Sequence, residues 1–208
     1  MADNYLERRQ EEVAAGSKKK VIRNHPSLDT LLHRNRSYRG FLSDRIVTEE
    51  ELKKIVATTT LVASGMNRQV LRYKLVTQEA NQVLPLITLG GALPQEHLPK
   101  PGTEPSAYIV VCSTIAEDRV VDMDLGIAAQ SMLLKATEMG LGGVFILNFR
   151  REALKEALNL PLEPLAVLAI GQPAENIYLL PGEEGHLAYY RKNGVHFVPK
   201  LPLDTVLL

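Results

Sequence analysis

Three separated stretches of the chain contain residues whose chemistry suits ligand binding. The first is RNRSYRGF, residues 34–41, which places three arginines around a serine. Guanidinium groups are planar donor forks, and they match a phosphate monoester, which carries about two negative charges at neutral pH. A solvated basic turn has the same composition, so this stretch alone does not distinguish an anion site from a surface turn.

The other two stretches are rich in small residues. ASGMNRQ, residues 63–69, combines small side chains, which let a backbone approach a flat ring, with amides that can hydrogen-bond the ring's edge. Residues 124–143 form an apolar helix pattern that ends in Gly140, Gly142 and Gly143. Residues 63–69 also have the composition of an ordinary loop. The glycines at the end of residues 124–143 are equally typical of a helix end followed by a turn.

Familiar catalytic motifs are absent from the sequence. It has no GxSxG elbow, no phosphate loop ending in Gly-Lys-Ser/Thr, and no GxGxxG that opens a helix after a strand. The five histidines form no HxxxH pair and have no acidic cluster beside them, so we expect no metal site. Cys112 is the only cysteine, which excludes an internal disulfide and a CxxC redox pair. Electron transfer would therefore need a bound cofactor. The sequence does not exclude a pair of carboxylates that hydrolyses a glycoside.

Charge and length limit the function classes further. Lysine and arginine together number 24, as do aspartate and glutamate, so no overall field favours nucleic acid or an anionic membrane. The N-terminus lacks the apolar stretch of a secretory signal, and no segment has the length of a membrane span, so we expect a cytoplasmic protein. The length predicts one domain over residues 1–208.

Periodicity and capping residues predict the helices of the N-terminal half. A helical arm within residues 1–25, with its helix at residues 5–13, precedes a helix at residues 27–33. A further helix begins at Thr48, because its hydroxyl and the side chain of Glu51 have the spacing of a capping box.

Strands and a long loop are predicted next. Residues 73–77 and 108–113 have the composition of strands, and the second is apolar enough for burial on both faces of a sheet. Between them, residues 90–105 are rich in glycine and proline and are predicted to form a long surface loop.

The strongest predicted helix covers residues 122–139 and ends where Gly140 adopts a left-handed conformation. An apolar run at residues 144–147, a helix at 151–158 and a strand at 165–170 follow. The C-terminal extension, residues 180–208, is predicted to be extended rather than helical. Its apolar end should pack against another surface and consists of Val206, Leu207 and Leu208. Together these elements predict an α+β domain with helices around a mixed sheet.

In this order the three stretches resemble the nitroreductase family of FMN enzymes. That family has an Arg-Ser-x-Arg segment, a Pro/Ala-Ser-x-x-Asn-x-Gln loop and an Asp-x-Gly-x-Ala…Gly-Leu-Gly helix. LPLEPLAVLAIGQPAE, residues 160–175, is similar to the family's strand ending in Ile-Gly-x-Pro, and YYRKNGVHFVPK, residues 189–200, to the ending of one branch of small members. The resemblance implies a three-layer α+β fold with a central mixed or antiparallel sheet flanked by helices, and an extended C-terminal tail. It also implies a homodimer, with each FMN pocket built between two chains.

The resemblance assigns cofactor contacts residue by residue. Arg36 and Ser37 would meet the phosphate and ribityl chain of FMN, and Lys200 would return from the tail to the phosphate. Arg39 would lie toward the N1 and O2 edge, where a cation stabilises the anionic reduced flavin and so sets the cofactor's potential. The partner subunit would contribute Ala63, Ser64, Gly65 and Asn67. The N5 edge of the flavin would lie near Ile146, Leu147 and Asn148.

The chain departs from the family pattern at several of these places. Asn35 stands where the family often has an arginine, and Gln69 is followed by Val70 and Leu71 rather than Pro-Trp. The pair Leu147–Asn148 replaces glycine-containing versions, and Leu201 stands where a basic residue often follows the last lysine. The phosphate end and the N5 side therefore lack some of the family's usual groups.

The implied activity is that of an enzyme, an FMN-dependent oxidoreductase that passes hydride from NAD(P)H to a small organic acceptor such as a nitroaromatic or a quinone. The flavin N5 carries the chemistry, so no side chain need act as a general acid or base. Two alternatives remain open, since a fold and a cofactor do not fix a substrate. One is a flavin-binding or sensing protein with little turnover. The other is a specialised family chemistry, reductive dehalogenation or flavin fragmentation, with a lid at residues 90–105.

Overall fold

The computed structural model describes residues 25–90, 93 and 96–208. The helix predicted at residues 5–13 lies outside the described residues. In chain order, the longer elements are α2 (Leu28–Arg34), α3 (Glu49–Val56), β1 (Leu71–Val76), α4 (Ala80–Val83), β2 (Ala107–Ser113), α5 (Arg119–Glu138), β3 (Gly142–Ile146), α6 (Arg151–Ala157), β4 (Glu163–Gly171), β5 (Asn176–Pro181), β6 (Tyr190–Lys192), β7 (Val195–Lys200) and α7 (Leu203–Val206). Short 3-10 turns occupy Ala57–Thr60, Gly65–Asn67 and Leu84–Leu86.

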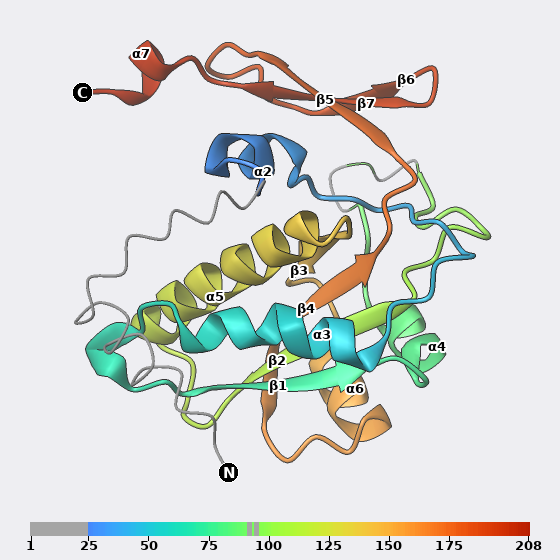
Figure 1. The fold of residues 1–208 in the computed structure, drawn as a ribbon, viewed down its shortest axis with the longest axis vertical. Helices are drawn as coiled ribbons and strands as arrows, with labels where there is room; N and C mark the ends of the chain where they lie inside the picture. Colours follow the sequence, from blue (N-terminus) through green and yellow to red (C-terminus); the bar gives the residue numbers. More distant parts are fainter. Residues whose placement is uncertain (1–24, 91–92, 94–95) are drawn as a thin grey trace.

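The central sheet has four antiparallel strands in the order β1-β2-β4-β3. Every residue of β2 is buried, as its unbroken apolar sequence predicts, and β4 is buried at all positions but its first. These two strands are the inner ones because each is paired on both sides. Figure 1 shows the sheet running through the middle of the molecule.

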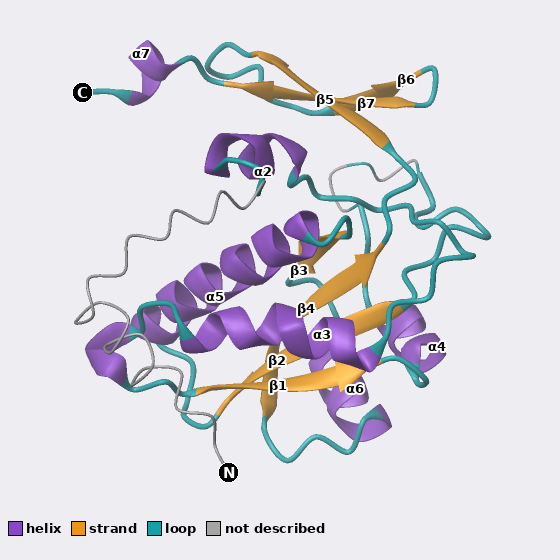
Figure 2. Ribbon diagram, viewed as in Figure 1, coloured by secondary structure: helices purple, strands orange, loops and turns teal. Residues whose placement is uncertain are grey.

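Helices cover both faces of this sheet and make a three-layer α+β fold, as predicted (Figure 2). On β2, Ile109 and Val111 pack in a core cluster with residues of α3 and α5. The intervening Tyr108 and Val110 belong to a second cluster, with residues of α4 and α6. This alternation follows from the two-residue period of a strand.

Local capping fixes two of the helices. At the start of α3 the Thr48 hydroxyl accepts from the Glu51 amide while the Glu51 carboxylate accepts from the Thr48 amide, which confirms the predicted capping box. Helix α5 begins at Arg119, three residues earlier than expected, because the carboxylate of Asp118 accepts the Val121 amide at 2.7 Å. It ends as predicted, with Gly140 at φ 77°.

The C-terminal residues form a second, smaller sheet in the order β5-β7-β6, with β5 parallel and β6 antiparallel to β7. In Figure 1 this C-terminal sheet lies beyond α2, on the side away from α5. Its strands alternate between two faces. Tyr178, Phe197 and Tyr190 stack on the outer face, with ring centroids 6.2 and 5.2 Å apart, and His196 lies on the inner face.

The tail is largely extended, as predicted, but Leu203–Val206 is a short helix, α7, which was not expected. At the end of the tail Val206 is 58% exposed and Leu207 is 62% exposed in the single chain. The packing of these residues against another surface therefore stays a prediction.

The described residues of the predicted loop, 90–105, contain no helix or strand, as expected. The loop is nevertheless anchored, because Leu98 bridges to Leu89 and packs on the cluster below α4 and α6. None of the helices in the described ranges combines enough length with enough apolar character to cross a bilayer.

Candidate functional site

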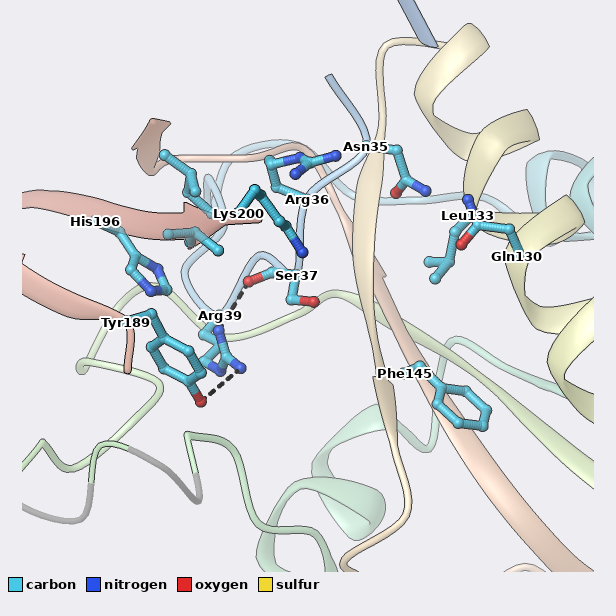
Figure 3. Close-up of a pocket in the computed structure, with 12 residues that line it drawn as sticks. Asn35, Arg36, Ser37, Arg39, Gln130, Leu133, Phe145, Tyr189, His196 and Lys200 are labelled. Carbon is cyan, nitrogen blue, oxygen red and sulfur yellow. Dashed lines mark hydrogen bonds between the residues drawn. The ribbon is translucent and has the colours of Figure 1, made fainter. Parts of the chain in front are cut away.

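A cavity of about 380 Å³ lies between the C-terminal sheet and the segment that follows α2, and we call it the cationic pocket (Figure 3). Its volume falls within the usual range for small-molecule sites. The lining residues are Asn35, Arg36, Ser37, Arg39, Gln130, Leu133, Phe145, Ile177, Tyr189, His196, Val198 and Lys200. Residues from near both ends of the described chain therefore meet here, including four of the eleven predicted cofactor contacts.

Backbone pairing with β3 places the arginine segment. Helix α2 ends at Arg34, and the chain then turns extended at Asn35, with ψ 100°. Ser37 forms a parallel bridge with Gly143, and the Tyr38 amide donates to the Gly143 carbonyl at 3.1 Å. A Cβ atom on Gly143 would lie only 2.4 Å from the Ala169 carbonyl oxygen. This glycine thus serves close strand packing rather than the turn that its sequence context indicated.

Arg36 is a partly buried cation of the pocket. One guanidinium nitrogen donates to the Leu32 carbonyl, while Nε is buried with no partner among the described residues. Burial lowers the pKa of Arg36 from its ordinary value, but an arginine remains charged at neutral pH. An unpaired buried donor is costly, so the pocket favours a ligand that accepts hydrogen bonds here.

Arg39 and Lys200 stand on the same side of the pocket. Nη1 of Arg39 donates to the Ser37 carbonyl at 3.0 Å, and Nη2 donates to the Tyr189 hydroxyl at 3.4 Å. The guanidinium also lies 5.3 Å from the centre of the Tyr189 ring. In Figure 3 the amine of Lys200 points toward Ser37 and Arg39.

His196 faces these cations from β7. Its side chain is 3% exposed, neither ring nitrogen has a partner among the described residues, and the ring lies 5.2 Å from that of Tyr189. Burial lowers the pKa of His196, and the charges of Arg191 and Arg39 lower it further, against the opposing effect of Glu175 and Glu96. The imidazole is therefore neutral at pH 7, with one nitrogen able to donate and the other to accept.

The donor set of the pocket fits a phosphate ester. Three cations and a serine hydroxyl line it, and no carboxylate does. A phosphate would be bound by donors alone, without like-charge repulsion. Arg36 and Ser37 would hold the phosphate with Lys200, whereas the polar Tyr189, His196 and Gln130 and the apolar Leu133 and Phe145 suit a larger, partly apolar body.

The predicted loop Ala63–Asn67 lies elsewhere, and we call residues 64–69 the strained loop. Met66, Asn67 and Gln69 all have positive φ, between 49° and 53°. The buried carboxylate of Asp124 fixes the loop, because Oδ2 accepts from the Ser64 hydroxyl and Oδ1 from the Gly65 amide, each at 2.8 Å. Left-handed backbone at non-glycine residues costs free energy and persists only where neighbours hold it.

The strained loop and the cationic pocket meet different parts of α5. The loop packs near Val120 and Asp124, beside a small cavity of about 230 Å³, whereas the pocket meets Gln130 and Leu133. Asp124 and Gln130 are six residues apart, about 9 Å along the helix axis and about a third of a turn around it. The chain therefore does not bring Ala63, Ser64, Gly65 and Asn67 to its own cationic pocket.

The third predicted group is also separate. Ile146 is 4% exposed and its side chain belongs to the core beneath α6, while Leu147 is 60% exposed. Asn148 lines a different cavity, together with Ile87, Thr88, Leu89, Gly90, Leu93, Glu96, His97 and Leu98. None of the three lines the cationic pocket.

Tyr189, His196 and Gln130 are pocket residues that sequence reasoning did not single out. Tyr189 and His196 belong to residues 189–200, the tail segment that carries the family resemblance, but only Lys200 of that segment was assigned to the site. Cys112 lies outside the pocket, and burial raises the pKa of its thiol to about 11, so it is protonated and unreactive at neutral pH.

Comparison with known proteins places these features in a family. A family model described as Nitroreductase family matches residues 32–172. An NADH dehydrogenase/NAD(P)H nitroreductase of Methanothermobacter thermautotrophicus is 30% identical over 150 residues, which is 68% of this chain and 74% of the relative.

Solved structures show the same fold. A nitroreductase family protein from Streptococcus pneumoniae superposes with a TM-score of 0.64 at 16% identity, over 88% of this chain and 99% of that one. An FMN-dependent nitroreductase from Clostridium difficile R20291 superposes with a TM-score of 0.55 at 23% identity, over 70% of this chain and 87% of that one.

Proposed function

Because this chain belongs to the nitroreductase family and is an oxidoreductase, we propose that it binds FMN and transfers hydride from NAD(P)H to a small organic acceptor such as a nitroaromatic or a quinone. FMN, when bound, supplies the centre that accepts and donates the hydride. The residues of the chain bind and orient the cofactor and exclude water from it. The observation that carries the proposal is the meeting of Arg36, Arg39 and Lys200 in one pocket without a carboxylate.

Each cation has a distinct task in this proposal. Arg36 and Lys200 bind the phosphate together with the Ser37 hydroxyl, and the unpaired Nε of Arg36 is a donor that a phosphate oxygen would satisfy. Arg39 would lie toward the pyrimidine edge of a bound flavin, where its charge would favour the reduced cofactor over the oxidised one. Through this charge the protein would set the reduction potential of the cofactor.

We further propose a homodimer in which the strained loop of one protomer completes the cofactor site of the other. Supporting this, the loop and the cationic pocket lie apart on one chain. Apolar side chains on α2 and α5 are also exposed, with Leu28 at 61% and Met123 at 52%. A monomer would leave this surface in water, and a second copy would cover it.

The experiment begins with the purified full-length protein. We expect a yellow protein with flavin absorbance, whose heat-released cofactor has the mass of FMN, and a molar mass in solution of two chains. Anaerobic addition of NADH or NADPH should bleach the flavin, and a quinone should restore its colour. A colourless, monomeric protein that takes up no added FMN contradicts the proposal, and a bound flavin that stays oxidised would indicate a binding or sensing role instead.

A further inference from the structure

A buried ion-pair network joins three distant segments beside the cationic pocket. Arg191 on β6 forms a hydrogen-bonded ion pair with Glu175, which follows β4, and its Nη1 lies 3.4 Å from Oε2 of Glu96 in the long loop. The Arg191 side chain is 15% exposed and that of Glu175 is 10% exposed. Charges so deeply buried add little net stability compared with apolar side chains of the same volume, so stability alone does not account for the network.

Glu175 connects this network to the arginine segment. Its second oxygen, Oε2, accepts the backbone amide of Arg39 at 2.5 Å. The neighbouring Ala174 amide donates to the Gly40 carbonyl at 3.1 Å, and a Cβ atom on Gly40 would lie 3.3 Å from Cγ of Glu175. The backbone at Arg39 and Gly40 is therefore pressed against the segment that Arg191 holds in place.

The C-terminal sheet also holds the other end of Arg39. The guanidinium donates to the hydroxyl of Tyr189, which immediately precedes β6, and stacks at 5.3 Å on its ring. Arg39 is thus fixed at its backbone through Glu175 and at its side chain through Tyr189. Both contacts depend on how β6 docks, and β6 carries Arg191.

We propose that Arg191 is a positioning residue for Arg39. Through Glu175 it fixes the backbone from which the guanidinium projects, and with Tyr189 it keeps that charge directed at the ligand of the cationic pocket. This inference rests on the proposed function. It adds that docking of the C-terminal sheet sets how strongly the site prefers the reduced cofactor, although Arg191 itself touches no ligand.

The test compares Arg191→Ala with Arg39→Ala in the FMN-loaded protein, by equilibration against dyes of known potential. We expect Arg191→Ala to weaken the preference for reduced over oxidised FMN about tenfold, which lowers the two-electron midpoint potential by about 30 mV. The double variant should match Arg39→Ala alone, because Arg191 acts only through Arg39. Additive shifts in the double variant, or an unchanged potential in Arg191→Ala, would overturn the proposal.

Arg151→Ala is the matched control, because Arg151 forms an ion pair with Glu117 and both side chains are more than 40% exposed. We expect its potential to equal that of the unmodified protein. If Arg191→Ala fails to fold, Arg191→Lys takes its place, since lysine keeps the charge without the two-pronged geometry. It should shift the potential in the same direction by a smaller amount, and an unchanged potential again contradicts the proposal.

A second readout needs no cofactor. Hydrogen exchange at the Arg39 amide reports its bond to Glu175, and it should accelerate about tenfold or more in Arg191→Ala while the core amide of Val110 is unaffected. Unchanged exchange at Arg39 would overturn the positioning role. If the protein binds no FMN, the proposed function fails, while this measurement still decides whether Arg191 positions Arg39.

Discussion

The cationic pocket and the strained loop were both expected to serve one cofactor, yet different groups hold them in shape. Both regions contain buried side-chain nitrogens without a hydrogen-bond partner among the described residues, on Arg36 and His196 in the pocket and on Arg68 in the loop. The backbone of the loop is held by a buried carboxylate, since Asp124 accepts from Ser64 and Gly65, and Ser64 in turn accepts the Gln69 amide at 3.0 Å. No carboxylate lines the pocket, so its cations stay available to an anionic ligand.

The largest effect should come from removing the residue that holds the strained loop. Asp124→Ala leaves two donors unsatisfied and releases three residues of positive φ, so we expect the free energy of unfolding to fall by about 3 kcal/mol. Urea denaturation measures this loss. The exposed Asp122 on the same helix is the control, and Asp122→Ala should lose far less. Equal losses would mean that the loop is not fixed by Asp124.

The pocket should show the reverse behaviour, in which binding rather than folding suffers. Arg36→Ala deletes a charge-assisted contact to phosphate worth about 1.5 to 3 kcal/mol, so FMN affinity should fall by roughly tenfold or more. The unfolding free energy should change little, because Arg36 leaves one donor unpaired in the protein itself. Fluorescence titration of FMN checks this, with the exposed Arg34→Ala as the control. Unchanged affinity in Arg36→Ala would remove this residue from the site.

A smaller effect should appear in the pH dependence of the free energy of unfolding, and its source is His196 in the cationic pocket. Burial and the neighbouring arginines hold the pKa of His196 below its ordinary value of 6.5, so the unfolded chain binds this proton more readily than the folded one. The stability contributed by neutral His196 is complete above pH 6.5 and is lost as the pH falls below that value.

Urea titrations of the ligand-free protein between pH 5 and 8 test this expectation, a range of about three units around the ordinary pKa of histidine. His196→Asn should flatten the acid side of the profile, whereas His186→Asn, at an exposed position, should leave it unchanged. A profile that His196→Asn does not alter would show that His196 keeps the same proton affinity in both states.

The smallest effect tests whether the loop is truly strained. Met66 has φ 52° and is 81% exposed, so Met66→Gly relieves the backbone without removing buried contacts. Relief of about 1 to 2 kcal/mol, set against the greater entropy of glycine in the unfolded chain, should leave a net stabilisation of about 0.5 kcal/mol. Met66→Ala keeps the strain and should show no such gain. A destabilised glycine variant would argue against stored strain.

Local chemistry made much of the fold predictable. The capping box at Thr48, the buried strand β2 and the glycine end of α5 were all readable because each depends on residues a few positions apart. The start of α5 was placed three residues late because Asp118 was not recognised as its cap. Short helix α7 was missed, since four residues carry too little periodicity to identify a helix.

The sequence by itself predicted an α+β domain with helices around a mixed sheet and a group of arginines suited to a phosphate, because apolar periodicity and arginine clusters are local properties of the chain. Only the tertiary structure decided which of the chosen residues meet within one chain. It placed Lys200 beside Arg36, as the resemblance implied, added His196, and left Ser64 and Asn148 elsewhere. The physical reason is that β7 pairs with β5 across a long connection and docks beyond α2. No spacing of residues in the sequence records that docking.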